Sequence, residues 1–232
     1  MGWLIAIAIL LVLLFLGWAS SDIGSGVYLR SRCRGRVQEQ VVALTFDDGP
    51  HETMTERVLE VLDHYQVPAT FFLVGEQIEH HPERVRRLVA KGHTIGGHSY
   101  HHRPTFALQS YRAVSRELQL TEQAAERATG LKMRLFRPPF GVTNPTIGRA
   151  VRKAGYTVVG WSIRSLDTVM RRSREEVCRR VLKRLHPGAV ILLHDRLPEA
   201  DRLLEQLLVG LRERGYRVVP IEELLKIEVY EK

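Results

Sequence analysis

Short apolar runs alternate with amphipathic stretches along most of this chain. Runs rich in β-branched and aromatic residues predict strands buried on both faces, at residues 41–46, 69–74, 93–97, 133–136, 156–161, 189–193 and 216–219. The stretches between them place apolar residues at helical spacing, at residues 54–65, 82–91, 109–129, 145–154, 174–185, 198–213 and 221–227. This alternation predicts an α/β fold.

The chain begins with an apolar segment of a different kind. Residues 3–19 carry no charge, and Trp3 and Trp18 lie near the two ends, where interfacial anchors are placed in membrane helices. The small residues around 18–21 also suit a signal-peptide cleavage site, but the usual basic residues do not precede the apolar part. We therefore predict a membrane anchor over 1–20, with a cleaved signal segment as the alternative, then a basic linker (21–37) and one folded domain (38–232).

Composition narrows the class of protein. With 232 residues, 44% of them hydrophobic, the chain can bury one substantial core. The net charge of +8 is spread along the chain, with a denser patch over 171–184. No nucleic-acid motif accompanies it, so attraction to anionic envelope polymer or lipid headgroups is the simpler explanation. Cys33 and Cys178 are too few for a disulfide framework or a cysteine metal site.

Paired acids at the end of the strand predicted over 41–46 are the first sign of chemistry. Asp47 and Asp48 repel each other, and one pKa must rise unless a cation intervenes. His98 and His102 stand four apart, which on a helical turn places both imidazoles on one face. A carboxylate and two imidazoles suit Zn²⁺ and related ions. A solvated surface pair of histidines is the alternative.

Two further apolar runs are followed directly by charged or titratable residues. The run over 189–193 leads into His194 and Asp195, and the run over 133–136 leads into Arg137. In a barrel of parallel strands, residues at the carboxyl ends converge on one face. Segments that are distant in sequence can therefore supply one pocket.

These motifs together resemble the NodB-type polysaccharide deacetylases, carbohydrate esterase family 4. The resemblance covers roughly residues 40 to 220 and rests on Thr45-Phe46-Asp47-Asp48-Gly49-Pro50, His98-Ser99-Tyr100-His101-His102, Arg137-Pro138-Pro139-Phe140-Gly141, residues 161–167 and Leu192-Leu193-His194-Asp195. It implies a distorted (β/α) barrel with about seven parallel strands. It also implies metal-dependent removal of N-acetyl groups from an N-acetylglucosamine-containing glycan, peptidoglycan or a chitin-like polymer, with release of acetate.

The resemblance also assigns roles to single residues. It implies Asp48, His98 and His102 as ligands of one divalent ion, most readily Zn²⁺, with Co²⁺, Ni²⁺ and Fe²⁺ as alternatives. It implies Asp47 as the general base and His194 as the general acid.

Residues around these groups complete the predicted site, namely Arg137, Pro139, Phe140, Trp161, Asp167 and Leu192. In the family the arginine pairs with the base and a further acid ties the arginine, here Asp167, while the backbone N–H of Phe140 serves the oxyanion. Trp161 is expected in core packing rather than as a sugar platform. Many relatives have Asp-Trp where this chain has Asp167-Thr168, which changes the wall of the substrate cleft.

Partners and location follow from the expected substrate. Polymeric N-acetylated glycans lie outside the cytoplasmic membrane, so we expect a monomeric enzyme of the bacterial cell envelope, anchored with its catalytic domain outside the cytoplasm. The basic residues over 30–36 point the other way, because positive flanks tend to stay inside. Two alternatives keep the same pocket: an O-acetyl polysaccharide esterase of the acetylxylan type, and an inactive, membrane-tethered glycan-binding protein.

Overall fold

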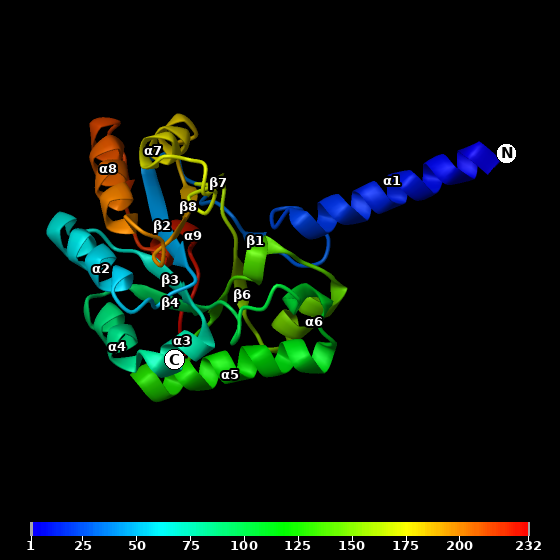
Figure 1. Ribbon diagram of the computed structural model, residues 1–232, viewed down its shortest axis with the longest axis horizontal. Coiled ribbons are helices and arrows are strands. Elements are labelled where there is room, and N and C mark those ends of the chain that lie inside the picture. Colours follow the sequence, from blue (N-terminus) through cyan, green and yellow to red (C-terminus); the bar gives the residue numbers. More distant parts are fainter. Residues whose placement is uncertain (1, 232) are drawn as a thin grey trace.

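One curled sheet of parallel strands organises residues 2–231, which the computed structural model describes (Figure 1). The strand order is β1-β6-β5-β4-β3-β2-β8-β7, and β9 pairs with β2. The strands are β1 (Ser31–Arg32), β2 (Val41–Asp47), β3 (Thr70–Leu73), β4 (Thr94–Gly97), β5 (Leu135–Phe136), β6 (Thr157–Val159), β7 (Ile163–Arg164), β8 (Ala189–His194) and β9 (Arg217–Val218). The expected α/β fold with a distorted barrel of parallel strands is confirmed. The described chain has nine strands rather than about seven, since β1 and β7 are too short for apolar periodicity to reveal them.

Helices alternate with these strands, and all of them except α1 pack around the sheet (Figure 1). They are α1 (Gly2–Ser21), α2 (Met54–Tyr65), α3 (Gly75–His80), α4 (Pro82–Ala90), α5 (Tyr111–Thr129), α6 (Pro145–Lys153), α7 (Arg174–Lys183), α8 (Ala200–Glu213) and α9 (Ile221–Leu225), with 3₁₀ turns η1 (Phe106–Leu108) and η2 (Pro139–Gly141). The sequence pattern did not predict α3, which buries only Gly75 and Ile78 and has no full apolar stripe.

The side chains of β2 point alternately to the two sides of the sheet. Val42, Leu44 and Phe46 belong to the large apolar core that also includes α2 and α8. Val41 and Ala43 belong to a second cluster inside the curled sheet, which α9 covers. The same alternation directs Thr45 and Asp47 inward, so the acid at the end of β2 enters the interior of the half-barrel rather than the helix layer.

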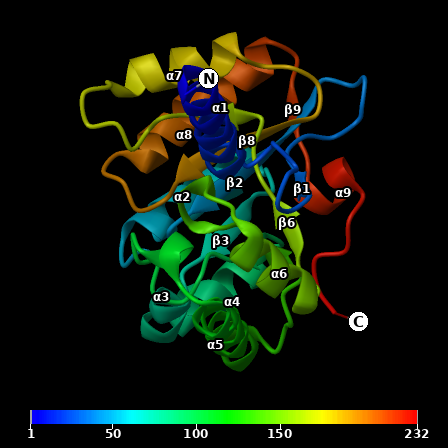
Figure 2. The ribbon, with the colours of Figure 1, turned by 90° about the vertical axis from the view of Figure 1, so that its right-hand side faces the viewer.

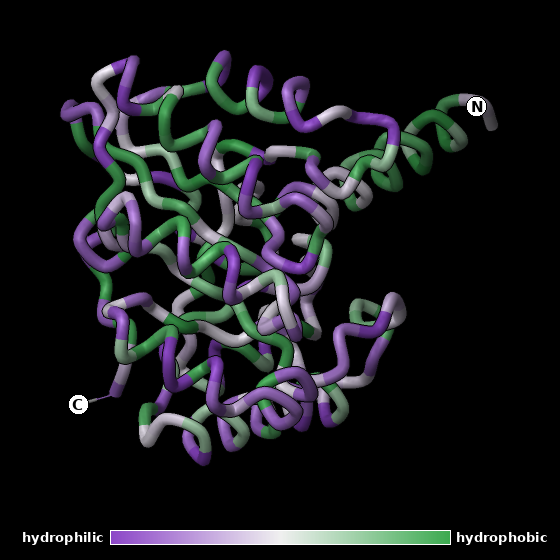
Figure 3. Tube along the Cα trace, turned by 60° about the vertical axis from the view of Figure 1, so that its left-hand side comes forward, coloured by the Kyte–Doolittle hydropathy of each residue, from purple (hydrophilic) through white to green (hydrophobic). Residues whose placement is uncertain are grey.

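Helix α1 projects away from the domain as a separate apolar rod (Figures 1 and 3). It is long and apolar enough to cross a membrane, and within it only Ala19 is buried against the rest of the chain. Residues 21–37, expected as a linker, are packed on the domain: they contribute β1, and they bury Ile23 and Leu29.

Candidate active site

Asp47 and Arg137 form a buried ion pair at the centre of the site. Arg137 is fully buried, and its Nη1 donates to Asp47 Oδ1 at 2.6 Å and to Thr45 Oγ1 at 2.9 Å. Its Nε and Nη2 donate to the carbonyl oxygens of Val159 and Gly160, at 3.0 and 2.9 Å. Burial lowers the pKa of Arg137, and the charge of Asp47 opposes that shift. With its donors occupied on several strands, the guanidinium holds the Asp47 carboxylate in one place.

Replacing Arg137 by Met should lower the free energy of unfolding by about 3–5 kcal/mol, since it leaves the charge of Asp47 buried without a partner. Urea unfolding followed by circular dichroism measures the loss. The double variant Asp47→Asn/Arg137→Met should recover part of it, because no charge then stays buried. A loss in Arg137→Met as small as that of an exposed arginine such as Arg202→Met would contradict the importance of this pair.

Asp48, His98 and His102 lie together beside this pair. Asp48 Oδ1 is 3.5 Å from His98 Nε2 and 3.3 Å from His102 Nε2. Each residue offers one ligand atom, and these three atoms lie within 4.8 Å of one another. The helical turn expected for the histidines is wrong: they lie in the irregular loop after β4, where Ser99 and His102 have positive φ angles of 65° and 50°. That left-handed turn brings the imidazoles together instead.

The donor set of this cluster fits a divalent cation. His98 Nδ1 donates to the carbonyl oxygen of Arg137 at 2.7 Å, which leaves the lone pair of Nε2 facing the carboxylate of Asp48. Such a backbone partner is typical of metal-binding histidines. Burial, and then the charge of His98, lower the pKa of His102 to about 4, so this imidazole is neutral at neutral pH. Burial alone would raise the pKa of Asp48, but its interactions with the neighbouring histidines, with His98 foremost, outweigh burial and keep the pKa below its usual value.

Arg196 is a site residue that sequence reasoning missed. Its Nε donates to Asp48 Oδ2 at 2.7 Å, so the second carboxylate oxygen is occupied while Oδ1 faces the imidazoles. Its position two residues after His194 was the available signal. The distance to Asp48 could not be inferred, because the two residues are 148 positions apart.

His194 faces Asp47 across the β2–β8 pairing and has a carboxylate partner of its own. Its Nδ1 donates to Asp167 Oδ1 at 2.9 Å, and its backbone N–H donates to Asp167 Oδ2 at 2.8 Å. Burial lowers the pKa of His194, but the hydrogen bond and charge of Asp167, with the charges of Asp47 and Asp48, outweigh it and raise the pKa above its usual value. The expected contact of Asp167 with Arg137 is wrong, because Asp167 is used on the histidine.

A cavity of about 170 Å³ opens between these groups. It is lined by Asp47, Asp48, His98, His102, Phe140, Gly141, Trp161, Arg164, Thr168, Leu192, His194 and Arg196. A second cavity of about 300 Å³ shares Asp48, His102 and Arg196 with it, and a third of about 120 Å³ shares His194 and also includes Asp167. The central cavity, at the carboxyl ends of the strands, thus shares lining residues with each of the other two.

The loop after β5 supplies one wall of the central cavity. Phe140 has a positive φ of 59° and a half-exposed ring, 4.8 Å between centroids from the ring of His102. Pro139 is buried beneath it. A Cβ on Gly141 would lie 2.4 Å from the Trp161 ring, so glycine lets the tryptophan approach. Trp161 is half-buried, as packing requires, and it also lines the cavity.

Asp195 anchors the loop that carries Asp48. It is fully buried, and its Oδ2 accepts from Thr55 Oγ1 at 2.5 Å. The same hydroxyl accepts the backbone N–H of His51 at 2.7 Å. Burial raises the pKa of Asp195 to about 7. The end of β8 is thereby tied to the start of α2 and to the turn that joins β2 to α2.

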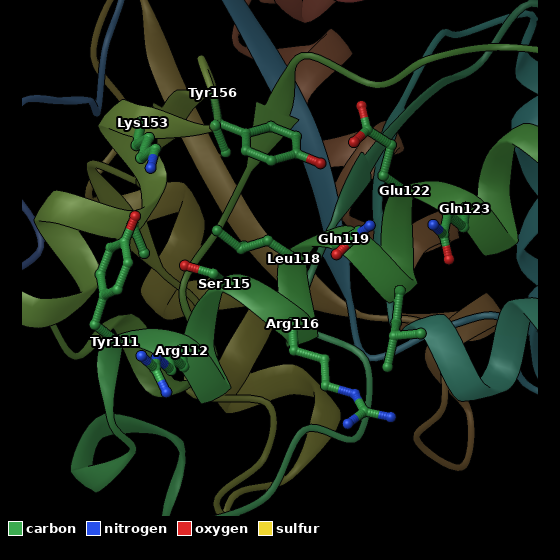
Figure 4. Close-up of a pocket in the computed structure, with 13 residues that line it drawn as sticks. Tyr111, Arg112, Ser115, Arg116, Leu118, Gln119, Glu122, Gln123, Lys153 and Tyr156 are labelled. Atoms are coloured by element: carbon green, nitrogen blue, oxygen red, sulfur yellow. The ribbon is translucent and has the colours of Figure 1, made fainter.

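A larger cavity, about 660 Å³, lies away from this site between α5 and α6 (Figure 4). Tyr111, Arg112 and Glu122 of α5, Lys153 of α6 and the nearby Tyr156 line it. It contains none of the residues that the sequence predicted for the site. The cluster of carboxylates and imidazoles lies instead at the carboxyl ends of the strands, where chemistry is expected.

The family model described as polysaccharide deacetylase matches residues 34–159. The chain is 30% identical to peptidoglycan-N-acetylmuramic acid deacetylase PdaA of Bacillus subtilis over 82% of this chain and 73% of the relative. It is 33% identical to a chitooligosaccharide deacetylase of Bradyrhizobium, over 79% of this chain and 90% of the relative.

Other relatives are longer or known in structure. Peptidoglycan-N-acetylglucosamine deacetylase PgdA of Listeria monocytogenes is 34% identical over 79% of this chain, which spans only 38% of that protein. The crystal structure of the Bc1960 peptidoglycan N-acetylglucosamine deacetylase superposes with a TM-score of 0.79 at 30% identity, covering 84% of this chain and 92% of that one.

Proposed function

This chain belongs to the polysaccharide deacetylase family, and from that premise we propose that it is a metal-dependent hydrolase that removes N-acetyl groups from an N-acetylglucosamine-containing glycan. The relatives named above are glycan N-deacetylases, so the chain is a hydrolase of that class. We propose that the folded domain over 38–232 carries the activity. The observation that carries the proposal is that Asp47 and His194, register partners on β2 and β8, line one cavity together with Asp48, His98 and His102.

Asp48, His98 and His102 are the residues that would hold the ion, which we propose to be Zn²⁺. When bound there, a divalent ion polarises the acetyl carbonyl and lowers the pKa of its water. Two neutral imidazoles and one carboxylate leave coordination positions open for water and substrate, as catalytic sites require. Co²⁺, Ni²⁺ and Fe²⁺ accept the same donors.

Asp47 is proposed as the general base. Arg137 occupies its Oδ1, while Oδ2 lies on the side of His98, at 3.8 Å from Nε2. The carboxylate can therefore accept a proton from the water that attacks the acetamide carbon without leaving its partner. The ion pair keeps the carboxylate oriented in a buried place.

His194 is proposed as the general acid on the other side of the scissile bond. Asp167 holds its Nδ1–H and favours the protonated ring, so the other ring nitrogen can give a proton to the departing amine. An amine leaves poorly without that proton. The backbone N–H of Phe140, at the rim of the same cavity, is proposed to donate to the oxyanion of the tetrahedral intermediate.

The cavities at the carboxyl ends of the strands support a glycan as substrate. The central cavity shares Asp48, His102 and Arg196 with one neighbouring cavity and His194 with another. Half-buried Trp161 and the exposed ring of Phe140 offer apolar faces to a sugar. Peptidoglycan and chitin-like oligomers both present the acetamido group that this site would hydrolyse, and we propose peptidoglycan or a chitin-like polymer acted on by a monomer.

We also propose that α1 is retained as a membrane anchor, with the catalytic domain in the cell envelope outside the cytoplasm. Support comes from the junction, where Ala19 is fully buried and its carbonyl oxygen accepts from Ser25 Oγ at 3.0 Å and from Thr143 Oγ1 at 3.2 Å. A site that signal peptidase could cut would need an exposed, extended chain, and here the helix continues to Ser21.

The first test is acetate release by the full chain loaded with Zn²⁺, against chitooligosaccharides, peptidoglycan and acetylxylan. We expect release from the acetamido glycans, and the relative rates identify the polymer. Release from acetylxylan alone would instead make the protein an O-acetyl esterase. Absence of acetate from every acetamido glycan, with a metal site shown to be filled, would overturn the proposal.

Arg196 should set the affinity of the cluster for its metal. Because its Nε–H occupies Oδ2 of Asp48, Arg196→Gln and Arg196→Lys should each weaken Zn²⁺ binding by about 10–100-fold, the usual effect of losing a residue that orients a ligand. Competition with a chromogenic chelator measures the affinity, and exposed Arg202→Gln is the matched control. An affinity that rises in Arg196→Gln and stays constant in Arg196→Lys would show that the charge of Arg196 repels the ion, contrary to this prediction.

A further inference from the structure

Helix α1 ends against the carboxyl edge of the sheet, meaning the edge formed by the loops that follow β2, β4, β5, β6, β7 and β8. The backbone N–H of Thr143, in the loop after β5, donates to the carbonyl oxygen of Ser20 at 2.9 Å. Ile23 is buried, and a Cβ on Gly160, just after β6, would lie 3.1 Å from its side chain. In Figure 2, which views the molecule from the side on which α1 projects, the helix comes toward the viewer. The start of the chain is therefore packed on the same edge that carries the active site.

Four exposed apolar side chains belong to the loops of this edge. Leu108 follows β4, Phe140 follows β5, and Val169 and Met170 follow β7. Met170 is fully exposed and Leu108 is 85% exposed. Outside α1, the other large apolar side chains exposed among residues 2–231 are Val27, next to the α1 junction, and Val209 of α8. Four of the six large apolar side chains exposed outside α1 are thus in loops of the edge to which α1 is attached.

The same loops are basic. Arg103 follows β4, Arg164 ends β7, and Arg171 and Arg172 come directly after Met170, all of them exposed. Of the exposed acids in the same loops, Glu199, after β8, is paired with Arg174 and Arg202, and Glu52, after β2, offsets one of the four arginines, so positive charge prevails. Apolar side chains flanked by arginine are the composition of a surface that sits in the headgroup region of an anionic bilayer.

We propose that the carboxyl edge rests on the surface of an anionic phospholipid bilayer, with Leu108, Val169 and Met170 entering the headgroup layer. The inference rests on the membrane anchor proposed above. A helix of 20 residues is about 30 Å long, which matches the hydrocarbon core of a bilayer. Its last residues then lie at headgroup level, and the hydrogen bonds between Thr143 and α1 hold the loop after β5 at that same level.

This orientation determines how substrate reaches the site. The cavity lined by Phe140, Trp161 and His194 opens on the edge that faces the lipid. The glycan would then be presented close to the bilayer surface rather than from the opposite side of the domain. A flexible tether would impose no such restriction, whereas this junction is buried and hydrogen-bonded.

The test measures the depth of single labels in the full chain, reconstituted in vesicles of phosphatidylglycerol and phosphatidylcholine. In a Cys33→Ser/Cys178→Ala background, a fluorophore is attached at Met170→Cys or Leu108→Cys, and quenching by lipids with a nitroxide at headgroup depth is recorded. Leu10→Cys within α1 reports insertion of the anchor. Glu213→Cys, exposed at the C-terminal end of α8 on the opposite edge, is the matched control.

We expect strong quenching at residues 170 and 108, weak quenching at 213, and less quenching at 170 in phosphatidylcholine alone or in Arg171→Glu. Suppose that lipids with a nitroxide in the acyl chain quench the fluorophore at residue 10, while headgroup nitroxides do not quench it at residues 170 and 108. That result would overturn the orientation and leave the anchor intact. Equal quenching at 213 would also overturn it. Loss of α1 from the purified chain, shown by its mass, would refute the anchor and this inference with it, whereas acetate release tests the deacetylase activity separately.

Discussion

Asp47→Asn should lower kcat/KM for acetate release by about 10²–10⁴-fold, the usual contribution of a general base, while leaving the metal in place. The amide cannot accept a proton from the attacking water, yet it keeps the shape of the carboxylate and can still accept a hydrogen bond from Arg137. The measurement combines acetate release with metal content by elemental analysis. It separates a catalytic role for Asp47 from a role in holding the metal, which belongs to Asp48.

Asp63→Asn provides the matched control for this substitution. Asp63 is a partly exposed acid on α2, paired with Lys91 at 2.7 Å, and it lines none of the three cavities of the site. It should leave turnover unchanged. Turnover near that of the natural protein in Asp47→Asn would refute the general-base assignment, and loss of the metal in the same variant would show that the acid acts through the ion instead.

The alkaline limb of the pH–rate profile should move to lower pH in Asp167→Asn. The general acid must be protonated, so activity falls as pH rises through the pKa of His194, which Asp167 holds above its usual value. Removing that charge leaves burial to dominate and lowers the pKa, so the ring loses its proton at lower pH. The profile of kcat/KM against pH, with a soluble chitooligosaccharide, measures the shift.

Replacing the acid itself gives the complementary result. His194→Gln should lower the rate by about 10²–10⁴-fold and remove the alkaline limb, because no group remains whose deprotonation stops proton transfer. Asp201→Asn, on α8, serves as the control and should leave the limb in place. An alkaline limb that stays unchanged in both His194→Gln and Asp167→Asn would assign the titration to another group and contradict the proposed acid.

Much of the fold could be predicted from the alternation of apolar and amphipathic segments. Helix α2 has the bounds that helical spacing predicted, and β2 differs by one residue, since buried parallel strands and amphipathic helices carry the strongest periodic signals. The two-residue strands β1 and β7 and the short helix α3 carry too few periodic positions to stand out. They become ordered by pairing and packing with segments far away in the chain.

For the site, the sequence by itself determined which strand ends bear acids and imidazoles. Asp47, Asp48 and His194 follow apolar runs whose carboxyl ends must converge in a parallel sheet. Only the tertiary structure decided the partners: Asp167 on His194 rather than Arg137, and Arg196 on Asp48. The docking of α1 beside the loop after β5 was likewise decided there. The physical reason is that side-chain partners depend on loop paths, including the positive φ angles of Asp48, Ser99 and His102, which no periodic pattern encodes.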